Sequence, residues 1–93
     1  MKQLTIHLPP EVEPYGEDLR RFFDAMVYKL KVHHRKGRWD GKTVEEYLPL
    51  LDGEVVELKE AVQSGNMVEI LTEAADCANM ALIISAIAIE RGK

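Results

Sequence analysis

The strongest constraint on the fold is the tripeptide Ser64-Gly65-Asn66, which lies between two long helical patterns. Gly65 is typical of a helix end, and Asn66 with Glu69 forms a capping-box sequence that begins a new helix. Two helices joined by so short a turn must lie antiparallel and side by side. The sequence therefore predicts a helical hairpin whose second helix runs to about Arg91.

Each helix of this hairpin carries two acidic residues three positions apart, a spacing that puts both side chains on one helix face. The pairs are Glu54 with Glu57 and Glu73 with Asp76. Both pairs fall in rows that otherwise have the spacing of a buried apolar seam. These rows are Leu50, Glu54, Glu57 and Ala61 on the first helix, and Glu69, Glu73, Asp76, Met80, Ile83 and Ile87 on the second. We therefore expect four carboxylates to converge at the edge of the core.

Converging carboxylates are unfavourable without a cation, because burial penalises their charge and like charges raise one another's pKa. A hard divalent ion removes both penalties, and an all-carboxylate ligand set suits Mg²⁺ or Mn²⁺ rather than Zn²⁺. The alternative is that the pairs are ordinary surface acids. The chain has 16 acidic residues in 93, so such pairs also arise by chance on solvated faces. From the residues alone both interpretations stay open.

Composition limits the class of protein. Ninety-three residues with 46% hydrophobic content suffice for one domain with a modest core, and a net charge of −4 argues against a nucleic-acid polymer as partner. The single cysteine, Cys77, excludes an internal disulfide framework and fits a reducing cytoplasm. The start of the chain lacks a signal-peptide pattern, and the most apolar run, Cys77 to Ile89, is shorter than a membrane span. We expect a cytoplasmic, soluble protein with no membrane partner.

The chain divides at about residue 15. In residues 1–15, Leu4, Ile6 and Leu8 alternate with polar residues before several prolines, which predicts a short extended arm or edge strand. Residues 16–93 form the single helical domain, whose first helix extends from about residue 17 to 34. Thr43 with Glu46 is a capping box that opens the next helix, in which Pro49 predicts a kink or a new helix start.

The last helix is apolar on nearly every side from Cys77 to Ile89. One small domain cannot cover such a helix, so a partner subunit is expected. The predicted fold is all-α, an antiparallel helical bundle completed by oligomerisation.

A dense basic stretch follows the first helical pattern, from Lys29 to Trp39, with Gly37 as a helix-ending signal. Basic side chains beside an aromatic residue can hold phosphates and a flat ring. The alternative is a solvated basic helix end with Trp39 packed against the core.

Together these residues resemble the MazG-like all-α nucleoside triphosphate pyrophosphohydrolases of the short single-domain type. The family motif, Glu-Glu-x-x-Glu and then Glu-x-x-Asp, stands here as Gly53-Glu54-Val55-Val56-Glu57 and Glu73-Ala74-Ala75-Asp76. Gly53 replaces the first acid. Lys36-Gly37-Arg38-Trp39 and Asn79 also match features of the short members.

The resemblance implies hydrolysis of a nucleoside triphosphate between the α and β phosphates, with Mg²⁺ as cofactor and Mn²⁺ as a substitute, in a homodimer or homotetramer. The implied metal ligands are Glu54, Glu57, Glu73 and Asp76, and Glu57 also takes a proton from the attacking water. The implied substrate-binding residues are Lys36 and Lys29 for phosphate, Trp39 for the base and Asn79 for the sugar or base. The alternative is a non-enzymatic helical dimerisation module whose acidic seam pairs with basic residues of a partner.

Overall fold

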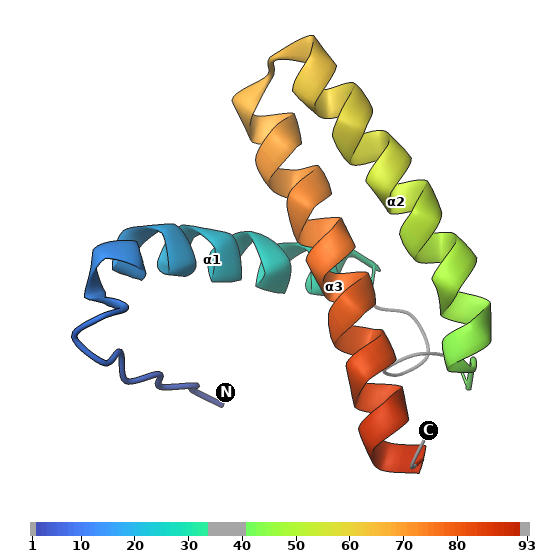
Figure 1. Ribbon diagram of the computed structural model, residues 1–93, viewed down its shortest axis with the longest axis horizontal. Coiled ribbons are helices and arrows are strands. Elements are labelled where there is room, and N and C mark those ends of the chain that lie inside the picture. The colour runs from blue at the N-terminus through green and yellow to red at the C-terminus, as the bar shows by residue number, and fades with distance from the viewer. Residues whose placement is uncertain (1, 34–40, 92–93) are drawn as a thin grey trace.

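A computed structural model describes residues 2–33 and 41–91, and within them every regular element is helical. A short 3-10 turn, η1 (Glu13–Tyr15), leads into α1 (Gly16–His33), which is followed by α2 (Val44–Ser64) and α3 (Met67–Arg91) (Figure 1). This arrangement confirms the all-α prediction. Residues 2–9 have no regular secondary structure, and the described part of the chain contains no strand.

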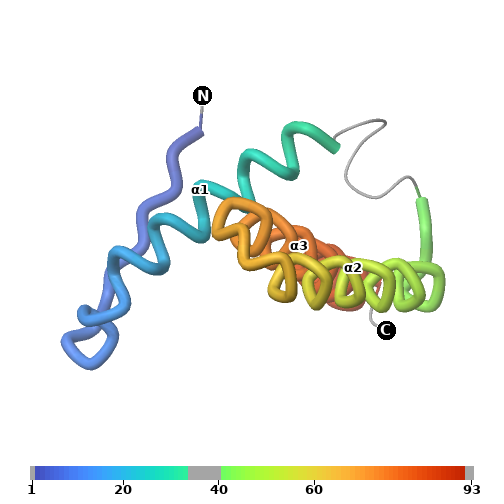
Figure 2. The backbone as a smooth tube through the Cα atoms, turned by 90° about the horizontal axis from the view of Figure 1, so that it is seen from above, coloured from blue at the N-terminus to red at the C-terminus, as the bar shows by residue number. Residues whose placement is uncertain are grey.

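The helices α2 and α3 form the predicted antiparallel hairpin and lie side by side in both views (Figures 1 and 2). Gly65 ends α2 with φ of 74°, and its N–H donates to the carbonyls of Ala61 and Val62. Glycine adopts this left-handed conformation at no steric cost, which explains the helix end at this position. The Asn66 side chain then accepts a hydrogen bond of 3.0 Å from the Glu69 N–H and so caps α3.

The start of α2 is set by the predicted capping box. The Thr43 hydroxyl accepts from the Glu46 N–H at 3.2 Å, and the Glu46 carboxylate accepts from the Thr43 N–H at 2.9 Å. The helix continues through Pro49 as one element. A proline removes one backbone hydrogen bond, and the remaining turns of this 21-residue helix hold it together.

The core of the hairpin is small and lies at two levels. Near the start of α2, Tyr47 and Ile87 are buried, with Val44, Met80, Ile83, Ile84 and Ala86 packed against them. Nearer the turn, the buried apolar residues are Ala61 and Ala75, both with small side chains. Large apolar side chains on α3 stay exposed, with Leu82 at 45% and Ile89 at 82%. The described residues therefore leave apolar surface open to solvent.

By length and composition alone, α3 could cross a membrane, since it has 25 residues and is largely apolar. The most apolar run, Cys77 to Ile89, is shorter than a span, but the helix that contains it begins ten residues earlier, at Met67. One such helix is weak support for a span, because a core helix of a soluble protein passes the same test. In this structure α3 packs against both α1 and α2.

Candidate metal centre

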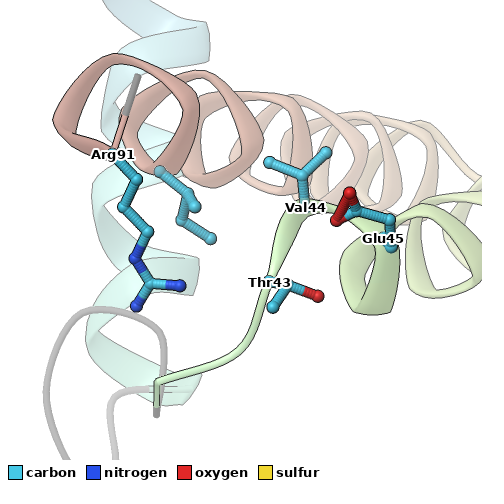
Figure 3. Close-up of a pocket in the computed structure, with 5 residues that line it drawn as sticks. Thr43, Val44, Glu45 and Arg91 are labelled. Carbon is cyan, nitrogen blue, oxygen red and sulfur yellow. The ribbon is translucent and has the colours of Figure 1, made fainter. Parts of the chain in front are cut away.

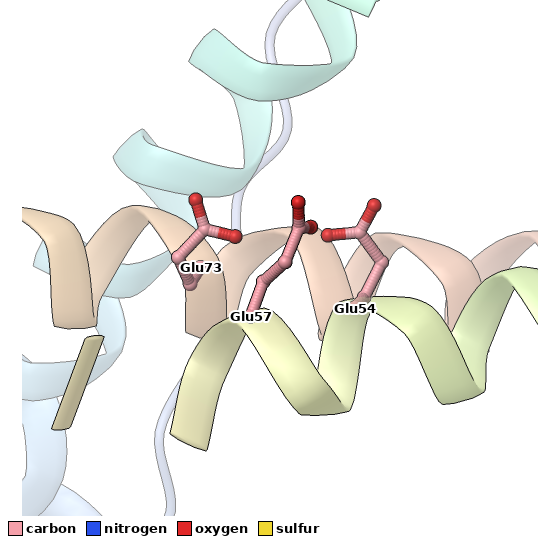
Figure 4. Close-up of side chains that lie close together, drawn as sticks. All are labelled: Glu54, Glu57 and Glu73. Carbon is pink, nitrogen blue, oxygen red and sulfur yellow. The ribbon is translucent and has the colours of Figure 1, made fainter. Parts of the chain in front are cut away.

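The hairpin brings three of the predicted acids together. Glu54 and Glu57 lie one turn apart on α2, and Glu73 faces them from α3 (Figure 4). One carboxylate oxygen from each residue lies within 4.8 Å of the other two. Glu54 and Glu73 are half-buried and Glu57 is exposed, so the group opens to solvent on the Glu57 side.

The environment of these acids opposes their negative charge. Burial raises the pKa of Glu54 to about 7, together with a hydrogen bond that the protonated Glu54 carboxyl donates to Glu57 and with the charge of Glu57. The charges of Asp76 and Glu73 add to the effect. Burial also raises the pKa of Glu73, helped by the charges of Glu57 and Asp76 and partly opposed by Lys29. These are the two causes, desolvation and like charge, that a bound cation would remove.

Two carboxylate oxygens of the group are also left without partners. Glu54 Oε2 and Glu73 Oε2 are both buried and accept no hydrogen bond from the residues that the structure describes. A buried acceptor without a partner is destabilising. Oxygen is also the ligand atom that hard divalent ions prefer. The residues present therefore fit an Mg²⁺ or Mn²⁺ ion.

The fourth predicted ligand, Asp76, is held by α1 and lies outside this close group. Its Oδ2 forms an ion pair of 3.2 Å with Lys29 Nζ, and its Oδ1 lies 3.7 Å from His33 Nε2. Asp76 is buried, with 7% of its surface exposed. Its charge still acts on Glu54 and Glu73, as their raised pKa values show. The structure thus brings three acids together and pairs the fourth with a lysine.

Two predicted substrate-binding residues lie where α1 meets α3. Lys29 contacts Asp76, and its side chain is only 17% exposed. Asn79 is 3% exposed, and its Nδ2 donates a hydrogen bond of 3.0 Å to the Met26 carbonyl, while its Oδ1 is buried without a partner among the described residues. Both side chains therefore link the two helices in this structure. The other two, Lys36 and Trp39, lie outside the described residues.

The sequence interpretation missed His33 as a neighbour of Asp76. His33 lies four positions after Lys29, a spacing that puts both side chains on one face of α1. This shared helix face was the signal in the sequence that Lys29 and His33 could contact the same residue. Using it would have required knowing which helix α1 packs against.

Two hollows flank the hairpin. An open acidic hollow of about 240 Å³ lies beside the three clustered glutamates and is lined by Glu57, Glu60, Ala61, Glu69 and Glu73. At the other end of the hairpin, Thr43, Val44, Glu45, Ile87 and Arg91 line a hollow of about 400 Å³ (Figure 3). There the Arg91 guanidinium donates a hydrogen bond of 3.3 Å to the Lys42 carbonyl, which ties the end of α3 to the start of α2.

Comparison of the chain with protein-family models, with curated proteins and with solved structures found no match. The relation to the MazG-like enzymes therefore remains a resemblance in motif.

Proposed function

We propose that this protein is a metal-dependent nucleoside triphosphate pyrophosphohydrolase that releases a nucleoside monophosphate and pyrophosphate. The observation that carries the proposal is the group formed by Glu54, Glu57 and Glu73, with ligand atoms within 4.8 Å of one another and two buried oxygens lacking partners among the described residues. The spacing of these acids also resembles that of the MazG-like family.

In this proposal Glu54, Glu57 and Glu73 hold Mg²⁺, or Mn²⁺ in its place, and Asp76 is the fourth ligand. When bound, the ion supplies Lewis acidity and neutralises phosphate charge, which carboxylates alone would repel. Glu57 is the exposed member of the group. Its carboxylate is therefore the one suited to accept the proton of the attacking water.

The remaining roles are proposed from the sequence. Lys36 binds phosphate charge, with Lys29 as a second cation, because ammonium groups attract phosphate oxygens. Trp39 stacks on the base. Asn79 hydrogen-bonds the sugar or base through its side-chain amide.

We further propose that the protein is cytoplasmic and functions as a homodimer or homotetramer, without a nucleic-acid polymer or a membrane as partner. The exposed apolar residues of α3, such as Leu82 and Ile89, support self-association, since a second subunit would cover them. Light scattering at micromolar concentration tests this, and a stable monomer would contradict it.

The activity is tested by incubating the protein with each common ribo- and deoxyribonucleoside triphosphate and Mg²⁺. Pyrophosphate and monophosphate are then measured separately from phosphate and diphosphate. Pyrophosphate release that EDTA abolishes is expected, and Glu73→Gln should remove it. Asp52→Asn is the control, because Asp52 is an exposed acid on α2 outside the group. Full activity of Glu73→Gln, or no pyrophosphate from any nucleotide with Mg²⁺ or Mn²⁺, would refute the proposal.

The exposed apolar surface also favours a second candidate, a non-enzymatic helical dimerisation module. The two candidates differ in their need for metal. Only the enzyme should bind Mg²⁺ or Mn²⁺ at its acids, whereas a dimerisation module should associate equally well in EDTA.

A further inference from the structure

The contact between Lys29 and Asp76 joins the candidate metal centre to a helix that supplies none of the three clustered glutamates. Both Asp76 oxygens face α1, with Oδ2 at 3.2 Å from Lys29 Nζ and Oδ1 at 3.7 Å from His33 Nε2. The side chains of Lys29 and Asp76 are 17% and 10% exposed. In an ion pair so shielded from water, removal of one partner leaves the other as an uncompensated buried charge, which is destabilising.

Two polar contacts link α1 to α3. Among the residues of α1, Gly16–His33, none is buried. Besides the Lys29–Asp76 pair, the Asn79 side chain donates to the Met26 carbonyl, so two buried polar residues of α3 meet α1 within one helical turn. Asp76 therefore has a well-defined cationic partner before any ion enters.

The same carboxylate also lies on the face of α3 that carries Glu73. Glu73 precedes Asp76 by three residues on α3, and its carboxylate belongs to the three-acid group. Asp76 is close enough for its charge to act on Glu54 and Glu73. A divalent ion held by that group attracts Asp76 and repels the Lys29 ammonium, since both are simple Coulomb effects at short range.

We propose that Lys29 is a positioning residue that is the counter-ion of Asp76 in the metal-free protein and yields this carboxylate to a divalent cation bound by Glu54, Glu57 and Glu73. This inference rests on the metal site of the proposed function. It makes Lys29 a competitor of the bound ion for the Asp76 carboxylate. Lys29 stabilises the fold while the acids lack an ion. It also weakens ion binding, because the ion must displace it.

The test is Mn²⁺ binding to the nucleotide-free protein, measured by calorimetry or by the electron paramagnetic resonance signal of free Mn²⁺. Lys29→Met should lower the Kd for Mn²⁺ about five- to tenfold, because it removes both the competitor and a repelling charge. The matched control is Lys31→Met, since Lys31 is an exposed lysine on the same helix, and its Kd should change less than about twofold. An unchanged or higher Kd for Lys29→Met would overturn the inference.

A double variant separates an effect through Asp76 from a general effect of charge. In the Asp76→Asn background, Lys29→Met should lower the Kd for Mn²⁺ clearly less than in the wild-type background, since the competition for Asp76 is gone and only the repelling charge is removed. An undiminished gain would mean that Lys29 acts on the ion directly, which contradicts the proposal.

Thermal melting in EDTA tests the counter-ion role even if Lys29→Met folds poorly. Lys29→Met should melt lower than wild type in EDTA and recover with Mn²⁺, whereas Lys29→Arg should behave like wild type. A Lys29→Met protein that melts like wild type in EDTA, or whose melting temperature Mn²⁺ does not restore, counts against the counter-ion role.

Wild type that binds no Mn²⁺ would refute the proposed function itself. Wild type that binds Mn²⁺ with the same Kd as Lys29→Met would refute only this inference.

Discussion

Replacing Glu54 by glutamine should stabilise the metal-free protein at alkaline pH. The pKa of Glu54 is raised from 4.5 to about 7, chiefly by burial and then by Glu57. For an acid with a raised folded-state pKa, the stabilising contribution is complete below the unfolded pKa of 4.5. It is lost as pH rises through about 7. Glutamine keeps the shape of the side chain and carries no charge at any of these pH values.

The size of the effect follows from this pKa. A pKa moved from 4.5 to about 7 corresponds at most to about 3 kcal/mol of lost stability at pH 8. Because the side chain is only half-buried, solvent screening reduces this to about 1–2 kcal/mol. For a domain of this size, that difference should raise the melting temperature of the variant by about 5–15 °C.

The assay is thermal melting followed by circular dichroism, in EDTA, from pH 5 to pH 8 and at one protein concentration. Wild type and Glu54→Gln should melt close together at pH 5 and diverge as the pH rises. Asp52→Asn removes an exposed charge two residues away and should show no such divergence. A difference between Glu54→Gln and wild type that is the same at pH 5 and pH 8 would refute the reasoning.

Magnesium should reverse the order at pH 8. A ligand that binds only the folded state stabilises it by about 2.7 kcal/mol at a hundredfold excess over its Kd. Wild type should gain this from Mg²⁺, and Glu54→Gln should gain much less because one ligand is lost. If Mg²⁺ and Mn²⁺ leave the wild-type melting temperature unchanged, the metal site does not exist.

Three further predictions concern other parts of the chain. Asp76→Asn should lower the melting temperature in EDTA, whereas Glu54→Gln should raise it. The Asp76 variant leaves the Lys29 ammonium, which is 17% exposed, without its carboxylate partner, at a cost of about 2 kcal/mol. A variant as stable as wild type, or more stable, would contradict the ion pair. Gly65→Ala should lower the free energy of unfolding in urea by about 1 kcal/mol, because φ at this position is 74°. Gly53→Ala should instead raise it by about 0.5–1 kcal/mol, because Gly53 lies inside α2 with open space for a methyl group. Lys36→Ala should raise KM for the triphosphate severalfold, and unchanged kinetics on every nucleotide would remove Lys36 from the proposed site.

Local sequence signals determined the hairpin and most of its acidic group. Capping residues and a left-handed glycine act within one helical turn, so the roles of Thr43 and Gly65 follow from their immediate neighbours in the chain. The antiparallel turn then placed Glu73 opposite Glu54 and Glu57, because a short connection leaves two helices little freedom. The periodic pattern was less reliable for individual seam positions, and Leu50 of the α2 row is 46% exposed.

Only the tertiary structure decided the partner of Asp76. Its spacing from Glu73 predicts a shared helix face, but a face is wide enough for one side chain to meet α2 and the next to meet α1. The choice depends on where α1 packs, and α1 is separated from α3 by more than 30 residues. Local sequence determines helix ends and shared faces, since these depend on neighbouring residues. The pairing of Lys29 with Asp76 depends on contacts between distant segments, which no local pattern contains.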